Sequence, residues 1–198
     1  MVLYALIGAE PHRPLPLLRE VGFHVALGGT VLSFVGAGMH FVYEKTGCNP
    51  VAAFFCAVNE SVYEHMKIML VPILAWWVVL VPACYDRAWP NLPVAASALY
   101  AAMVLLLVGN AGLSAIEIES LAADITLFCV CIFVAQAVGV WVRRRGPGPF
   151  VDVCSLLGPF LFLLVLVMLS VCTFFPPRVA YLFEDHRNHT YGRPDVCP

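Results

Sequence analysis

The densest run of ionisable side chains in this sequence lies at residues 59–67, Asn-Glu-Ser-Val-Tyr-Glu-His-Met-Lys, directly before a long apolar segment. Read as the start of a helix, Asn59 is the expected N-cap and Glu60 places negative charge in the first turn, where the helix dipole favours it. Glu60 and Glu64 then share one face, because residues four apart are neighbours on a helix surface. With His65 beside them, this spacing predicts two carboxylates and an imidazole at the mouth of the apolar segment. The same pattern is equally typical of a helix boundary that has no function.

Three further ionisable residues lie inside or at the edge of other apolar segments. His40 and Glu44 form an i,i+4 pair where the first apolar segment ends, and Asp124 lies about one turn into the fourth. A carboxylate inside a membrane span costs roughly 2.5–3.5 kcal/mol unless something compensates it. Asp124 therefore needs a partner. The residues expected at the same depth are His40, His65 and Lys67.

The composition excludes a water-soluble protein. Hydrophobic residues make up 61% of the 198 residues, charged residues make up 12%, and the mean hydropathy is +0.86. Soluble domains carry about 25% charged residues, which is about twice the fraction in this chain. The few polar groups of this chain could not cover the surface of a protein in water. We predict an integral membrane protein that contacts the lipid bilayer. The formal net charge of −2 and the lack of a broad basic surface predict no nucleic-acid partner.

The apolar residues fall into five segments, each close to the ~20 residues that a bilayer crossing needs. They predict an all-α fold, a polytopic transmembrane helical bundle of about five spans, with a short interfacial or re-entrant helix at 51–58. The expected spans are 21–42, 66–85, 92–113, 121–142 and 151–175. We expect a surface segment at 1–20, which lacks the pattern of a cleaved signal peptide, and the transmembrane bundle at 21–177. A polar tail at 178–198 is expected to pack on the outer face.

Basic residues indicate the orientation, because Lys and Arg beside the ends of spans stay on the cytoplasmic side. Arg143, Arg144 and Arg145 end the fourth span, whereas the loop that contains Glu117 and Glu119 has neither Lys nor Arg. The N-terminus is therefore expected in the cytoplasm and the C-terminus outside or in a lumen. In this topology the acidic residues and histidines described above gather at the outer end of the bundle.

Most of the eight cysteines lie within or beside apolar segments, where Cys behaves as a small hydrophobic residue. Only Cys48 and Cys197 lie in polar segments. They could pair if both face an oxidising compartment, but the sequence does not establish the distance between them.

A cluster of carboxylates and imidazoles at one end of a bundle is compatible with a metal site, an acid–base or ion-binding site, or a structural tie between helix ends. The residues expected to ligate a divalent metal such as zinc are His40, Glu64, His65 and Asp124. Those expected to act as catalytic acid–base groups are Glu60, Glu64, His65 and Asp124. The chain contains no His-Glu-x-x-His, Gly-x-Ser-x-Gly or phosphate-loop motif, so the metal site is argued from proximity alone.

The run at 59–67 resembles the Asn-Glu-Ser-Val-Trp-Glu-His-Leu-Lys signature of an uncharacterised family of small multi-spanning membrane proteins, a domain of unknown function. The resemblance extends to 40–44, to Asp124 and to a closing pattern at 173–192, and so covers most of the chain from the first span onward. One departure is Tyr63, where the family usually has Trp. The resemblance implies no activity, but it implies that the residues selected on physical grounds belong to one recurring constellation.

We therefore expect an integral membrane protein with a polar His/Glu/Asp site at the outer end of its bundle. The function favoured is a metal- or acid–base-dependent enzyme that acts on a lipid-like substrate. The alternatives are a proton-coupled carrier of a small solute and a non-catalytic structural or assembly protein. Five spans without an internal repeat count mildly against the carrier, because many transporters are built from duplicated halves.

Overall fold

The computed structural model describes residues 21–81, 91–118, 120–145, 149–185 and 188–193, and within these ranges the chain is helical and has no β-strand. In the tail, Glu184 and Tyr191 form an isolated antiparallel bridge. The predicted all-α fold is confirmed. The surface segment expected at 1–20 lies outside the described residues.

The elements follow one another as a series of long helices with short helices between them. In chain order they are η1 (Gly22–Gly28), α3 (Gly29–Lys45), α4 (Pro50–Phe55), α5 (Val62–Ala75), η2 (Trp76–Leu80), α7 (Asn91–Ala115), α8 (Leu121–Arg145), α9 (Pro149–Val167), η3 (Met168–Cys172) and α10 (Ala180–Phe183), where η marks a π-helix.

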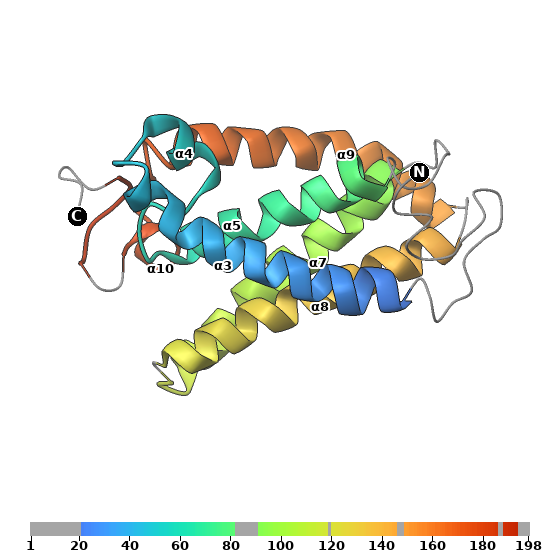
Figure 1. Cartoon of the computed structure of the whole chain (residues 1–198), viewed down its shortest axis with the longest axis horizontal. Coiled ribbons are helices and arrows are strands. Elements are labelled where there is room, and N and C mark those ends of the chain that lie inside the picture. The colour runs from blue at the N-terminus through green and yellow to red at the C-terminus, as the bar shows by residue number, and fades with distance from the viewer. Residues whose placement is uncertain (1–20, 82–90, 119, 146–148, 186–187, 194–198) are drawn as a thin grey trace.

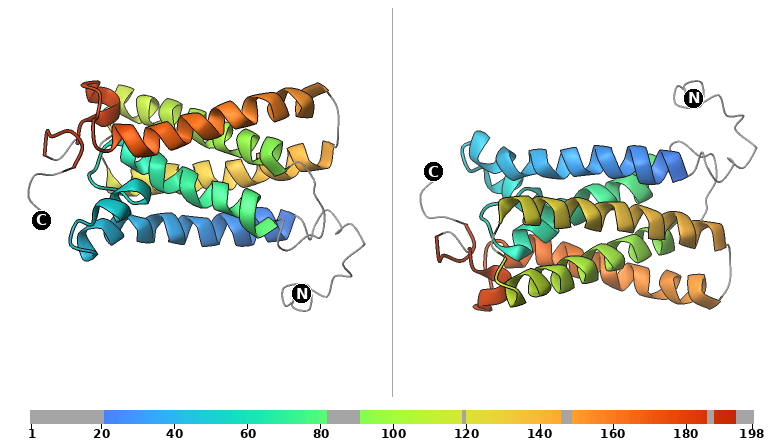
Figure 2. Two further views of the ribbon diagram at one scale, coloured as in Figure 1. Left: turned by 90° about the horizontal axis from the view of Figure 1, so that it is seen from above. Right: turned by 90° about the horizontal axis from the view of Figure 1, so that it is seen from below.

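Four helices in the described part of the chain are long and apolar enough to cross a membrane. They are Gly22–Lys45, Val62–Leu80, Leu92–Ala115 and Leu121–Arg145. They correspond to the first four expected spans, and their length and composition are those of a multi-spanning membrane protein. α9 continues into η3 and runs alongside the bundle (Figures 1 and 2). It occupies the place of the fifth expected span, whose crossing of the membrane stays a prediction.

The helix that follows the ionisable run begins later than predicted. Ser61, not Asn59, is the N-cap of α5, and its hydroxyl accepts a hydrogen bond from the backbone N–H of Glu64. The Asn59 side chain instead accepts from the N–H of Ser61 at 2.9 Å, which forms a turn before the helix. The predicted N-cap at Asn59 is therefore wrong by two residues. As a consequence, Glu60 lies in the linker and does not share a helix face with Glu64.

The short helix expected at 51–58 is present as α4 and ends earlier, at Phe55. Pro50 occupies its first turn, where the missing N–H of proline does no harm. The Asn49 side chain caps it by accepting a hydrogen bond from the N–H of Val51 at 2.8 Å.

The long helices lie side by side, and the core fills the space between them (Figure 2). Its fully buried side chains include Trp77, Met69 and Ile132. Glycine allows the closest approach: a Cβ at Gly36 of α3 would lie 3.0 Å from the carbonyl oxygen of Ile68 in α5. Small residues at helix contacts are the usual packing device in lipid.

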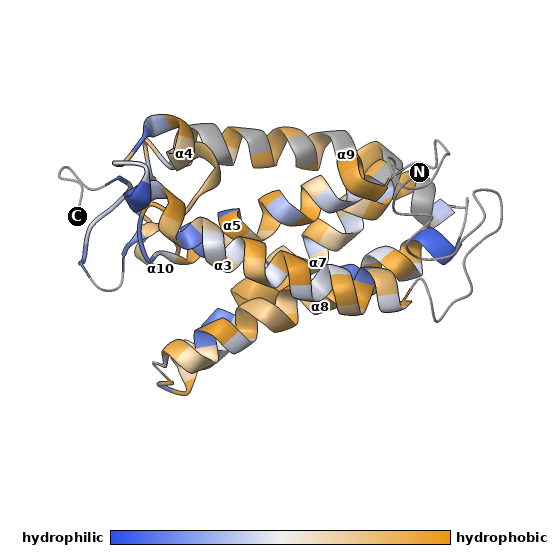
Figure 3. Ribbon diagram, in the orientation of Figure 1, coloured by the Kyte–Doolittle hydropathy of each residue, from blue (hydrophilic) through white to orange (hydrophobic). Residues whose placement is uncertain are grey.

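Polar residues concentrate towards the two ends of the bundle, whereas its length is largely apolar (Figure 3). One end, at the left of Figure 1, gathers the end of α3, α4, the start of α5 and α10; we call it the polar end. Arg143, Arg144 and Arg145 finish α8 at the opposite end. The orientation of the polar end towards the outside or a lumen stays a prediction.

Candidate functional site

Three of the predicted site residues meet at the polar end: His40 from α3, Glu60 from the linker before α5, and His65 from α5. Oε1 of Glu60 lies 3.1 Å from Nε2 of His40, and Oε2 of Glu60 lies 3.7 Å from Nε2 of His65. The two imidazole rings stack with their centroids 5.3 Å apart. One ligand atom from each residue lies within 4.8 Å of the other two. We call these three residues the His-Glu-His cluster.

Local backbone geometry decides which nitrogen of His65 faces Glu60. Nδ1 of His65 lies 2.9 Å from the carbonyl oxygen of Ser61. Because a carbonyl oxygen only accepts hydrogen bonds, Nδ1 carries the proton and Nε2 of the neutral ring carries a lone pair. That lone pair faces a carboxylate oxygen of Glu60, which is also an acceptor. The two atoms repel each other unless a proton or a metal ion lies between them.

The His-Glu-His cluster is partly buried and has an open side. The exposed fractions of its side chains are 23% for His40, 25% for Glu60 and 31% for His65. Asp124 lies in the first turn of α8, and its negative charge interacts with His65. The Asp124 side chain is exposed, so it lies beside the cluster and not within it. A water molecule or another small ligand can therefore reach the partly exposed side chains of the cluster.

Glu64, predicted both as a metal ligand and as an acid–base residue, is placed elsewhere. Its carboxylate forms a direct ion pair with the ammonium of Lys67, and both side chains are buried, with exposed fractions of 1% and 0%. The ammonium also donates to the carbonyl oxygen of Ala53 at 2.8 Å and to Oγ1 of Thr173 at 3.0 Å. All three donors of the ammonium group therefore have an acceptor. The pair joins α5 to α4 and to the segment after η3.

Sequence reasoning missed this role of Lys67, which it assigned to the neighbourhood of Asp124. The available signal was the i,i+3 spacing of Glu64 and Lys67, a spacing at which opposite charges meet on a helix. The pattern does not reveal that the pair is buried, because burial depends on the elements that cover it.

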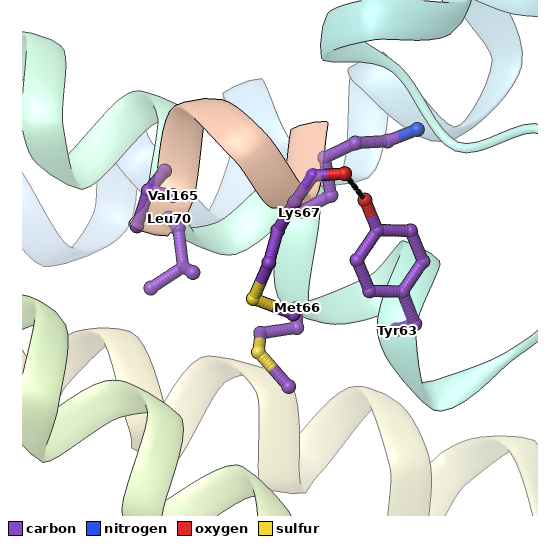
Figure 4. A pocket seen from close by; sticks show the side chains of 6 residues that line it. Tyr63, Met66, Lys67, Leu70 and Val165 are labelled. Atoms are coloured by element: carbon purple, nitrogen blue, oxygen red, sulfur yellow. Dashed lines mark hydrogen bonds between the residues drawn. The ribbon is translucent and has the colours of Figure 1, made fainter. Parts of the chain in front are cut away.

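A small, mostly apolar crevice lies on the other side of Lys67, between α5 and α9 (Figure 4). The residues that line it are Tyr63, Met66, Lys67, Leu70, Val165 and Met168. The Tyr63 hydroxyl donates a hydrogen bond to the carbonyl oxygen of Met168. Lys67 contributes its methylene chain, and its ammonium points away from the crevice (Figure 4). The crevice therefore offers packing surface and no charged group.

The tail is tied to the polar end by hydrogen bonds between distant parts of the chain. The Asn59 amide donates to the carbonyl oxygen of Gly192 at 2.9 Å, and Arg193 Nε donates to the Tyr43 hydroxyl at 3.0 Å. These contacts hold the linker that carries Glu60 against the end of the bundle. They thereby help to position the His-Glu-His cluster.

Two described cysteines of the polar end, Cys48 and Cys56, are not part of the cluster. Burial raises the pKa of the Cys56 thiol, which therefore stays protonated and is a poor nucleophile or metal ligand. Cys48 is disulfide-bonded. Cys197, its expected partner, lies outside the described residues, so this pairing stays a prediction.

Comparison with other proteins identifies a family and no activity. No curated protein and no solved structure matches the chain. Residues 20–193 match the family described as "Family of unknown function (DUF6512)", and this range contains both the His-Glu-His cluster and the Glu64–Lys67 pair. The chain therefore belongs to the DUF6512 family, an uncharacterised family of the kind that the resemblance in its sequence implies.

Proposed function

We propose that this protein is a metal-dependent membrane enzyme in which His40, Glu60 and His65 ligate a divalent metal, with zinc as the first choice. The observation that carries the proposal is the convergence of two imidazole Nε2 atoms on the two oxygens of one carboxylate. Imidazole and carboxylate ligands suit zinc, manganese and iron. In this ligand set Glu60 takes the place that the sequence suggested for Glu64, and Asp124 lies outside the first coordination shell.

The observed distances fit a zinc ion after a small adjustment. Zinc bonds imidazole nitrogen and carboxylate oxygen at about 2.0–2.2 Å, so tetrahedral angles separate two ligand atoms by about 3.4 Å. The contacts of 3.1 Å and 3.7 Å lie on either side of this value. The largest possible separation between any two of the three ligand atoms is 4.8 Å. This exceeds the tetrahedral separation of about 3.4 Å by about 1.4 Å, a difference that rotation of the partly exposed side chains can close.

Three protein ligands leave an open position for water or substrate, as in catalytic zinc sites. A bound metal ion lowers the pKa of its water to about 7 and so generates a nucleophile. Asp124, an exposed carboxylate in the first turn of α8, would be the group that accepts the proton of that water. Phe41 and Ile125, which follow His40 and Asp124 in the chain, are exposed apolar residues. This setting at the edge of the bilayer favours a lipid or another amphiphile as substrate.

Metal analysis of the detergent-purified full chain tests the proposal. After incubation with zinc and removal of free metal, we expect about one zinc ion per chain and at least tenfold weaker binding in Glu60→Gln and His65→Ala. His189→Ala is the matched control, because His189 also contacts a carboxylate, that of Glu184 at 2.9 Å, but is 79% exposed and lies outside the cluster. Zinc binding that is equal in the wild type and both cluster variants contradicts the proposal.

A wild type that folds normally but binds no zinc, manganese or iron also contradicts the metal site. If Glu60→Gln and His65→Ala then only lower the melting temperature, the cluster is a structural tie between α3 and α5. The contact of 3.1 Å between His40 and Glu60 favours this second role, because it has the length of an ordinary hydrogen bond.

A further inference from the structure

A second set of polar side chains lies inside the bundle, between η2 and α8. Trp77 and Gln136 both have an exposed fraction of 0%. Among the described residues, Nε1 of Trp77 and both Oε1 and Nε2 of Gln136 have no hydrogen-bond partner. Because about nine in ten buried polar groups are paired in proteins, three such atoms on two side chains need an explanation.

The packing at Gly139 places these atoms in one region. A Cβ at Gly139 would lie 3.0 Å from Nε1 of Trp77 and 2.6 Å from Cε2, so the polar edge of the indole rests on the backbone of α8. Gln136 lies one turn before Gly139 on the same face of α8 and is buried there as well. Trp77 and Gln136 are therefore both buried where η2 packs against α8.

The neighbouring tryptophan shows how an indole in this region is normally satisfied. Trp76 donates from Nε1 to Nδ1 of His24 at 3.1 Å. The His24 ring stacks on Trp77 with centroids 4.8 Å apart. His24 lies in η1 and both tryptophans lie in η2, so two π-helices meet here. π-Helical turns occur frequently at functional sites.

We propose that Trp77 and Gln136 bind an internal water molecule that bridges η2 and α8. The ligand must accept a hydrogen bond from the indole N–H and donate one to the amide oxygen. Water does both, whereas an anion cannot donate and a metal cation cannot accept. Buried water typically makes about three hydrogen bonds, and the indole N–H, the amide oxygen and the amide nitrogen supply that number. The bridge ties the two helices together at membrane depth.

Thermal unfolding of Gln136→Met tests the bridge, because Met has a similar volume but no hydrogen-bonding amide. Removal of the amide expels the water and leaves the indole N–H unpaired, so we expect the melting temperature to fall by about 3 °C or more. In a Trp77→Phe background the same substitution should have less than half of this effect, since the bridge is already broken. Ser97→Ala serves as a control for the loss of a buried polar group, because the Ser97 hydroxyl donates a hydrogen bond within its own helix, to the carbonyl oxygen of Pro93 at 2.8 Å.

Two results of these unfolding measurements would overturn the water bridge. If the amide is buried without a ligand, Gln136→Met removes an unsatisfied group and leaves the melting temperature unchanged or raises it. Equal effects in the wild-type and Trp77→Phe backgrounds also overturn the proposal, because they show that the two side chains are not coupled. Size-exclusion elution of each variant at the wild-type volume confirms that the comparison concerns folded protein.

Discussion

Replacement of Lys67 by methionine should be among the most damaging single substitutions in this protein. The substitution removes the cation but keeps the length of the side chain, so it leaves the carboxylate of Glu64 buried without a counter-charge. It also leaves the carbonyl oxygen of Ala53 and the hydroxyl of Thr173 without their donor. Breaking a buried ion pair by removal of one partner costs about 3–5 kcal/mol.

The expected loss converts into a large change of melting temperature. At about 2–4 °C per kcal/mol for a domain of this size, Lys67→Met should melt about 6–20 °C below the wild type in the same detergent. The double variant Glu64→Gln/Lys67→Met should recover much of this loss, because no charge is then left buried. Lys45→Met is the matched control: Lys45 is exposed at the end of α3, and its loss should shift the melting temperature by about 2 °C at most.

Two results would contradict a buried Glu64–Lys67 ion pair. If Lys67→Met lowers the melting temperature by less than about 3 °C, the ion pair is not buried as described. A double variant that melts lower than Lys67→Met would show that the single variant does not suffer from an unpaired carboxylate. Both measurements need only the purified chain and a thermal-shift assay.

Packing at Gly139, the contacts of the tail and the chemistry of the cluster can each be tested separately. Gly139→Ala should lower the melting temperature, because the new Cβ would clash with the indole of Trp77. Gly112→Ala is the control, since a Cβ there would have no neighbour within 4 Å, and equal shifts in the two variants would contradict this packing. Arg193→Gln should speed limited proteolysis of the tail, because the hydrogen bond from Arg193 to Tyr43 is lost, and an unchanged cleavage rate would refute it. Zinc affinity of the His-Glu-His cluster, measured by calorimetry, should fall as the pH is lowered, since protons compete for the imidazoles; a pH-independent affinity would exclude imidazole ligands.

The membrane bundle could be predicted from the sequence, because hydropathy and the length of the apolar segments determine it almost alone. α8 (Leu121–Arg145) covers the span expected at 121–142, and the arginines that mark its end belong to the helix itself. α4 was also predictable, because Asn49 and Pro50 carry a local signal for a helix start. In both cases the information lies within a few residues of the element.

The candidate site was harder to predict from the sequence, because contacts between distant parts of the chain determine its geometry. Asn59 and Ser61 are both good N-cap residues, and sequence rules do not choose between them. In the structure the Asn59 amide bonds to Gly192, 133 residues away, and Ser61 takes the cap. This two-residue difference moves Glu60 off the helix and towards His40, and it separates Glu60 from Glu64. No local pattern in the sequence carries that information.

In the proposed metal site, two imidazoles and one carboxylate of the His-Glu-His cluster ligate a single metal ion. X-ray absorption at the zinc edge of the zinc-loaded protein measures this ligand set. The proposed site predicts a first shell of only nitrogen and oxygen at about 2.0–2.2 Å, with outer-shell scattering from two imidazoles that falls to that of one imidazole in His65→Ala. A first shell that contains sulfur at about 2.3 Å, or an imidazole signal that survives unchanged in His65→Ala, would contradict it.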